Sequence, residues 1–138
     1  MISLTRRYRF PAAHVLRRGD WSEAENVRVY GKCAHRNGHG HDYGIELTVT
    51  GPLDPTSGRV LDPARLDALV RERVLERFSH RMLNEDPLFE RLVPTAENLA
   101  LAIQRELAEP LAHAGTARLL NVRVVETPRN TFDTGEPR

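Results

Sequence analysis

The chain carries its most reactive side chains in one short stretch. Cys33, His35, His39 and His41 fall within nine positions, and Cys33 is the only cysteine of the sequence. Imidazole and thiolate are ligands that zinc prefers, so this spacing suggests a metal centre with a thiol beside it. Ordinary hydrogen bonds can also satisfy histidines near strand ends, and that alternative holds for any single one of them.

The strand that follows decides which histidines point inward. Over Tyr43–Val49 apolar residues alternate with polar ones, as in a half-buried antiparallel strand. The same period counted backwards puts His39 and His41 on the apolar face. Gly40 between them leaves the opposite face without a side chain. The pattern therefore predicts two imidazoles that point into the protein together.

A third histidine ends the predicted first strand. The alternation of Ile2–Phe10 continues inward to His14, beyond a proline that limits further pairing. Three histidines with one open coordination position form a catalytic zinc site that can take substrate oxygens. A thiol near a cation ionises more readily, so Cys33 is a candidate base or nucleophile. His80, just past the first predicted helix, is a candidate proton carrier.

Two helices and a last strand complete the expected order. The first helix is predicted over residues 63–78, after the N-cap residue Asp62, and the second begins at Pro94 and Thr95. The second is expected to stop at Pro110. A last strand is then predicted over Arg118–Thr127, and its apolar face ends on Glu126. This carboxylate is either an exposed strand end or a group that faces a ligand.

The remaining segments are expected to be irregular, apart from a brief return pairing at residues 59–61. Loops are predicted over 21–30, with one helical turn, and over 84–93, and residues 128–138 are expected to be weakly structured. The order strand, strand, helix, helix, strand predicts an α+β domain. Both helices pack on one face of an antiparallel four-stranded sheet.

Length and composition limit the class of protein. A chain of 138 residues with 40% hydrophobic content fits a single domain over residues 1–138 that needs no disulfide or structural metal, so a bound metal is expected to be catalytic. One cysteine and the absence of a long apolar run predict a cytoplasmic protein with no membrane partner. A net charge of +1 argues against general nucleic-acid binding.

Five short motifs follow one another along the chain in a characteristic order. They are Phe10-Pro11-Ala12-Ala13-His14, then Cys33 with five residues before His39-Gly40-His41, Ser79-His80 with Leu83-Asn84, Pro94-Thr95 with Glu97-Asn98, and Val125-Glu126-Thr127. Together they resemble the 6-pyruvoyltetrahydropterin synthase family, which includes the 6-carboxytetrahydropterin synthases, and the resemblance spans Ile2 to about Thr127. The five-residue gap after the cysteine is similar to the pyruvoyl-forming branch.

The resemblance implies a fold, a reaction and roles for single residues. The family has a tunnelling fold, and its trimers stack in pairs as hexamers with sites between subunits. Its substrate is 7,8-dihydroneopterin triphosphate. By position, His14, His39 and His41 would hold Zn²⁺ against the side-chain hydroxyls, and Cys33 and His80 would move protons. Three further residues would bind the pterin: Glu126 at its edge, with Thr95 and Glu97 lining the pocket.

One departure from the family pattern keeps a second function open. The family has an aspartate directly before its catalytic histidine, where this chain has Ser79 before His80. Serine supplies a hydrogen bond but no charge to stabilise a histidine cation. The chain is thus expected to be a zinc-dependent lyase that releases triphosphate. The alternative is a repurposed pterin-binding paralogue that keeps zinc and pocket. A third reading, a metal-binding protein without a pterin site, would not explain why Glu126 falls on the apolar face of its strand.

Overall fold

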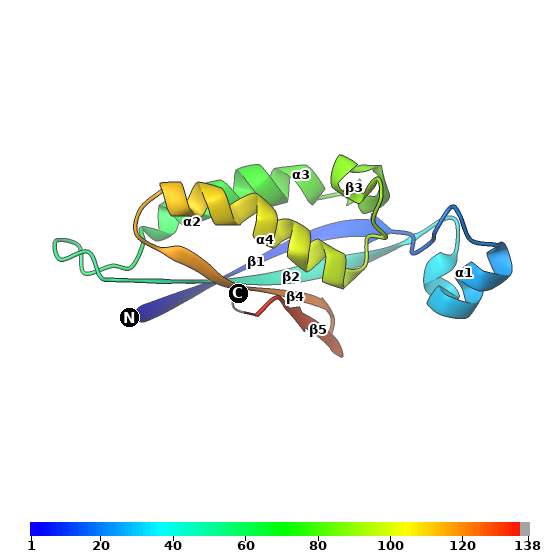
Figure 1. Cartoon of the computed structure of the whole chain (residues 1–138), viewed down its shortest axis with the longest axis horizontal. Helices are drawn as coiled ribbons and strands as arrows, with labels where there is room; N and C mark the ends of the chain where they lie inside the picture. The colour runs from blue at the N-terminus through cyan, green and yellow to red at the C-terminus, as the bar shows by residue number, and fades with distance from the viewer. Residues whose placement is uncertain (136–138) are drawn as a thin grey trace.

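A five-stranded sheet forms one layer of the molecule, and two long helices cover one of its faces (Figure 1). The computed structural model describes residues 1–135. The strand order in the sheet is β3-β1-β2-β4-β5. The strands are β1 (Ile2–His14), β2 (His39–Gly51), β3 (Arg81–Met82), β4 (Arg118–Thr127) and β5 (Asn130–Asp133). The expected α+β class is confirmed.

The register of the long strands β1 and β2 determines which of their side chains face each other on the inward side of the sheet. The two strands run antiparallel in a continuous register from Ile2 opposite Gly51 to His14 opposite His39. Phe10 and Tyr43, which face each other in this register, are buried and stack with ring centroids 5.5 Å apart. The predicted alternation is therefore confirmed as far as the last paired residues.

The first helical segment covers the predicted range. It consists of α2 (Pro63–Val70), a π-helical turn (Arg71–Leu75) and α3 (Glu76–Phe78), and the Asp62 side chain accepts a hydrogen bond from the backbone N–H of Ala64 at 3.0 Å. Its buried face is Leu66, Val70, Val74 and Phe78. The π-helical turn was not predicted.

The second helix, α4 (Ala96–His113), begins where the sequence predicts and ends later. Thr95 caps it by accepting a hydrogen bond from Asn98 N–H at 3.2 Å. The predicted stop at Pro110 is wrong, because the helix continues through the proline to His113. Leu111, just beyond Pro110, is buried and extends the apolar stripe, which offsets the missing backbone donor.

Over residues 1–135 the sheet has five strands and not the expected four, and one predicted loop is a helix. β3 pairs in parallel with Ala12 and Ala13 of β1, so the sheet is mixed and not purely antiparallel. β5 pairs with β4 inside the segment expected to be weakly structured, while residues 136–138 lie outside the described part of the chain. Residues 59–61 form no strand, and α1 (Glu23–Tyr30) replaces the expected loop with one helical turn.

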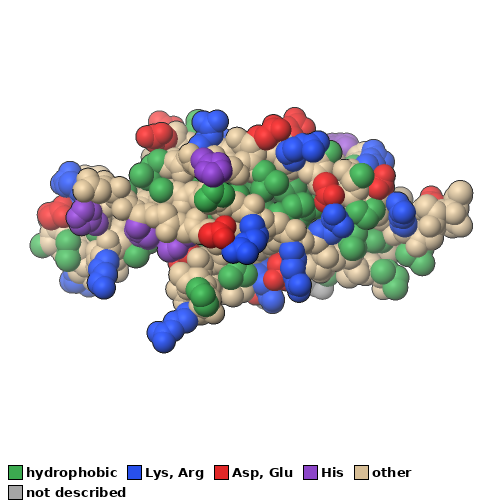
Figure 2. Space-filling view, turned by 180° about the vertical axis from the view of Figure 1, so that it is seen from behind, with side chains coloured by type: hydrophobic (Ala, Val, Ile, Leu, Met, Phe, Trp, Pro, Cys, Tyr) green, Lys and Arg blue, Asp and Glu red, His purple; other side chains and the backbone are tan. Residues whose placement is uncertain are grey.

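The end of the sheet that carries the histidines projects toward a narrow lobe formed by α1 and the following 3₁₀ turn, Gly31–Ala34 (Figure 1). Figure 2 shows histidine side chains where this lobe meets the body of the molecule. Along residues 1–135, none of the helices has the length and apolar character needed to span a membrane.

Candidate metal centre and active site

The three predicted ligands, His14, His39 and His41, come together at this end of the sheet. His14 and His39 face each other across β1 and β2, and His41 follows two residues later on the same face. One ligand atom from each imidazole lies within 4.8 Å of the other two. The three rings meet edge to face, with centroids 4.6 to 5.0 Å apart.

The orientation of His14 leaves one nitrogen free for a metal. Its Nδ1 lies 2.8 Å from the carbonyl oxygen of Pro94, which can only accept, so Nδ1 carries the proton and Nε2 has a free lone pair. That Nε2 lies 3.0 Å from Nε2 of His39. Two nitrogens bound at ~2.0–2.1 Å to a tetrahedral ion lie about 3.3 Å apart. This pair is therefore close enough to bind one metal ion, and three imidazoles are a donor set that suits zinc.

Burial keeps His14 and His39 in the neutral form that binds metal. The pKa of His14 is lowered to about 4, mainly by loss of solvent; the hydrogen bond to Pro94 opposes the shift, and the neighbouring His39 and His41 add to it. Burial also lowers the pKa of His39, with a smaller contribution from His41. Both side chains are thus uncharged at neutral pH.

Cys33 lies half-buried on the 3₁₀ turn, near Tyr43. Burial raises the pKa of the Tyr43 hydroxyl, Glu126 and Cys33 add to the shift, and Tyr43 in turn contacts His14. The Cys33 carbonyl oxygen accepts a hydrogen bond from Leu16 N–H at 2.8 Å, which ties the turn to the residues after β1. Burial raises the pKa of the thiol, and the negative charge of Glu126 raises it further. The protein without a metal therefore favours the neutral thiol, and a cation in the histidine cluster would favour the thiolate.

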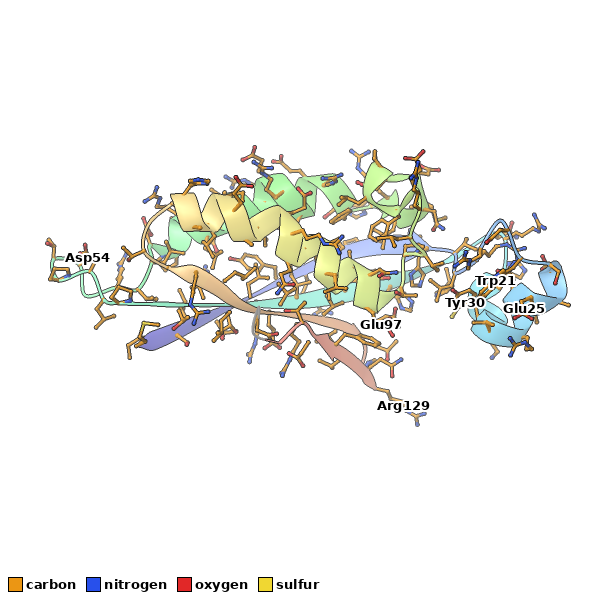
Figure 3. All side chains as sticks on the ribbon, viewed as in Figure 1. Trp21, Glu25, Tyr30, Asp54, Glu97 and Arg129 are labelled. Carbon is orange, nitrogen blue, oxygen red and sulfur yellow. The ribbon has the colours of Figure 1, made fainter. Side chains whose placement is uncertain are left out.

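Glu126 at the end of β4 is half-buried and belongs to the same electrostatic cluster. Burial raises its pKa most, the charge of His41 opposes the shift, and Glu97 adds to it. Glu97 is exposed in the first turn of α4. Figure 3 shows Glu97 on the same side of the molecule as Arg129, which follows β4. Thr95 is the N-cap residue of α4. Its hydroxyl oxygen accepts a hydrogen bond from Asn98 N–H, and its hydroxyl group can still donate its own proton.

His80 lies just before β3, at the β1 edge of the sheet, and is exposed. Its backbone N–H donates to Pro11 O at 2.7 Å, and it is the one non-glycine residue within 1–135 with a positive φ, 59°. It lines a hollow of about 550 Å³ together with His41 and Asp42. Among the described residues no hydrogen bond joins its side chain to Cys33, so the two predicted proton carriers are not hydrogen-bonded to each other within one chain.

Three participants were not predicted as part of the site. The Pro94 carbonyl is a backbone group, which the sequence cannot single out. Tyr43 was predicted to point inward, but its contact with His14 was not predicted; its hydroxyl oxygen lies 3.2 Å from His14 Nδ1. Gly38 has φ of 72°, and a Cβ there would lie 3.1 Å from the carbonyl oxygen of His14. A glycine directly before His39 was the available signal.

Comparisons with known proteins agree with this arrangement. The family model for 6-pyruvoyl tetrahydropterin synthase matches residues 3–137. A 6-pyruvoyl tetrahydrobiopterin synthase of Drosophila melanogaster is 38% identical over 135 residues, which cover 97% of this chain and 79% of the relative. The protein of that name from Homo sapiens is 37% identical over 128 residues, covering 92% and 86%.

A solved structure gives the same result for the fold. The 6-pyruvoyl tetrahydropterin synthase of Caenorhabditis elegans superposes with a TM-score of 0.90 at 36% identity, covering 99% of this chain and 96% of that chain. The tunnelling fold implied by the sequence motifs is thereby confirmed, with the difference in strand count described above.

Proposed function

The chain belongs to the 6-pyruvoyl tetrahydropterin synthase family, and we propose that it is a zinc-dependent carbon–oxygen lyase that converts 7,8-dihydroneopterin triphosphate into a 6-substituted tetrahydropterin with release of triphosphate. One observation carries the proposal. A cluster of three histidines lies beside a half-buried carboxylate, Glu126, whose pKa responds to His41. A metal-binding group and a group suited to a pterin edge therefore face the same space.

Glu126 would anchor the pterin. Its two carboxylate oxygens can accept parallel N–H bonds from the aminopyrimidinone ring, a bidentate contact that requires a fixed carboxylate. Burial raises the pKa of this carboxyl group, so two ring donors would stabilise its charged form. Thr95 and Glu97, at the start of α4, would line the rest of the pocket.

His14, His39 and His41 would hold zinc, which supplies Lewis-acid polarisation of the substrate's side-chain hydroxyls when bound. Cys33 Sγ would take a proton from the side chain of the substrate and return a proton to the ring. The electrons released when the side chain is oxidised reduce the dihydropterin ring, so no external oxidant is needed. His80 would carry a second proton. If the site lies between subunits, the His80 of a neighbouring copy would do so, since no hydrogen bond joins His80 to Cys33 among the described residues of one chain.

The pyruvoyl compound is the proposed product. Two observations support this choice over the carboxy compound. Five residues separate Cys33 from His39, as in the pyruvoyl-forming branch, and relatives 37–38% identical carry a 6-pyruvoyl name.

A repurposed pterin-binding paralogue is the second candidate, and Ser79 favours it. The family aspartate at this position would orient and charge-stabilise the histidine, whereas the Ser79 backbone N–H donates to Leu75 O at 3.0 Å and its side chain carries no charge. Such a protein would keep the zinc and the pterin pocket but release no triphosphate.

A hexamer built from two trimers is the proposed assembly. Over Ile2–Phe10, β1 pairs with β2 alone among the described strands, so its other edge is open. Joining sheets between copies would close such an edge. The mass measured by light scattering at micromolar concentration should therefore exceed that of the monomer. A free Cys33 thiol suits the cytoplasm, which we propose as the compartment.

The direct test is an incubation of zinc-loaded protein with 7,8-dihydroneopterin triphosphate, followed by measurement of released triphosphate. Glu126→Gln keeps the shape of the side chain and removes its charge, so release should fall. His113→Ala changes an exposed histidine at the end of α4 and should leave release unchanged. Pterin binding without triphosphate release would favour the paralogue.

A further inference from the structure

The turn that carries Cys33 lies outside the sheet, so something else must fix the thiol relative to the histidines. Two hydrogen bonds connect the turn to the residues after β1. Leu16 N–H donates to Cys33 O at 2.8 Å, and the Arg17 guanidinium donates through Nη1 to Ala34 O at 2.8 Å. Within residues 1–135, no other side chain donates to a backbone carbonyl of this turn.

The same guanidinium also binds helix α1. Arg17 Nη1 lies 3.2 Å from Oε1 of Glu23, and Nη2 forms a second, short hydrogen bond with Oε2. Glu23 in turn lies 3.4 Å from the guanidinium of Arg36, in the segment that leads to His39. The Arg17 side chain is 19% exposed, which is low for a charged group near the end of a strand. Arg17 thus links three segments around Cys33.

Helix α1, which carries Glu23, is itself anchored to the residues after β1. The side chain of Asn26 is buried and binds the backbone of Arg18 in both directions, accepting from its N–H at 2.8 Å and donating to its O at 3.1 Å. The helix is therefore fixed to the residue directly after Arg17. Glu23, about one turn earlier on α1, can then orient the guanidinium without moving itself.

We propose that Arg17 is a positioning residue, whose guanidinium holds the Gly31–Ala34 turn through Ala34 O and thereby places the Cys33 thiol beside the histidine cluster. The proposal rests on the proton-carrying role of Cys33 given above. Arginine suits this task because its planar fork can donate to a carbonyl and a carboxylate at once. Lysine would offer a point charge with freely rotating donors and could not hold both in one plane.

The metal ligands do not depend on this contact. His14 and His39 are fixed by the register of β1 and β2, and Nδ1 of His14 donates to Pro94 O. Loss of Arg17 should therefore displace the thiol while zinc binding persists. A misplacement of about 1 Å can lower a rate by ~100-fold, so kcat should fall by about 10- to 100-fold with little change in KM.

The test compares Arg17→Ala and Arg17→Lys with Arg18→Ala, all as zinc-loaded full-length protein. Arg18 is a matched control, because its side chain also pairs with a carboxylate, Asp20, and lies over Trp21, but donates to no backbone carbonyl of the Cys33 turn. Cys33 is the only cysteine, so its rate of alkylation by iodoacetamide reports on this thiol alone. Zinc content, thermal unfolding and kcat are measured on the same samples.

Arg17→Ala should change the alkylation rate by about threefold or more and lower kcat, with zinc content equal to that of Arg18→Ala. Arg17→Lys, which keeps the charge and is the less disruptive change, should show the same effects more weakly. An alkylation rate or a kcat within twofold of the Arg18→Ala control would overturn the proposal. If the wild type releases no triphosphate, the proposed function fails separately, and alkylation still decides whether Arg17 positions the thiol.

Discussion

His14 and Pro94 are 80 positions apart in the chain, yet Nδ1 of the histidine lies 2.8 Å from the carbonyl oxygen of the proline. The contact joins the end of β1 to the loop before α4. It fixes the tautomer of His14 and aims Nε2 at the other two histidines. The candidate metal centre is therefore built from the sheet and from the loop that also leads to the proposed pterin pocket.

Replacement of His39 should remove the metal. His39→Ala deletes one of three ligands and leaves two that lie on different strands, so zinc content should fall from near one per chain to a small fraction. Elemental analysis of the purified protein measures this. His113→Ala is the control, and retention of full zinc content by His39→Ala would show that the ligand assignment is wrong.

Gly38→Ala should destabilise the protein through crowding as well as strain. The added Cβ would lie 3.0 Å from Met82 Cε and 3.1 Å from His14 O, at a φ of 72°. Gly58 has a similar φ of 69°, but an added Cβ there would meet no atom within 4 Å, so Gly58→Ala measures the backbone strain without the crowding. We expect a loss of about 1–3 kcal/mol for Gly38→Ala, and less for Gly58→Ala, in urea unfolding. Equal losses would mean that the neighbours of Gly38 give way freely.

The metal-free protein should lose stability as the pH falls from 7 to 5. The pKa of His14 is about 4 in the folded protein and 6.5 ordinarily, so the unfolded chain binds more protons over this range. His39 shifts in the same direction. One such proton gives a slope of up to about 1.4 kcal/mol per pH unit.

Urea unfolding after chelation at several pH values measures this slope. His14→Gln removes the titrating group and should flatten the curve, although it should also be less stable at pH 7. A wild-type stability that stays constant between pH 7 and 5 would contradict the assigned burial of the imidazole.

The position before His80 should limit the reaction. Ser79→Asp adds a carboxylate that favours the cationic imidazole, and we expect kcat to rise by about tenfold, since acid–base contributions are ~100- to 10,000-fold. Zinc content and pterin binding should not change. An unchanged or lower kcat in an active protein would mean that another carboxylate, such as Asp42 of the same hollow, already serves His80.

Alternation along the strands was enough to predict that three histidines converge into a group that could hold a metal. The period of two is a local property, so it placed His14, His39 and His41 on one face before any contact was known. The same parity put Tyr43 inside and Glu126 at the end of an apolar face. The burial of these side chains agrees with that placement.

The missed elements depend on contacts that periodicity does not detect. Helix α1 has Asn26 as its buried residue and exposes Val27 and Val29, so no apolar stripe marks it. β5 follows an irregularity in the pairing between Val125 and Thr127, which interrupts the alternation. The contact of Arg17 with Ala34 O joins a side chain to a backbone carbonyl, and the sequence contains no sign of it.

The decisive measurement for the proposed lyase is the mass of the pterin product after incubation of zinc-loaded protein with 7,8-dihydroneopterin triphosphate. We expect a 6-pyruvoyl tetrahydropterin together with triphosphate, and neither product from the His39→Ala protein. A 6-carboxy product would keep the lyase activity and assign the chain to the carboxy-forming branch. Recovery of unchanged substrate from a protein that binds zinc and pterin would show that the chain is not this lyase.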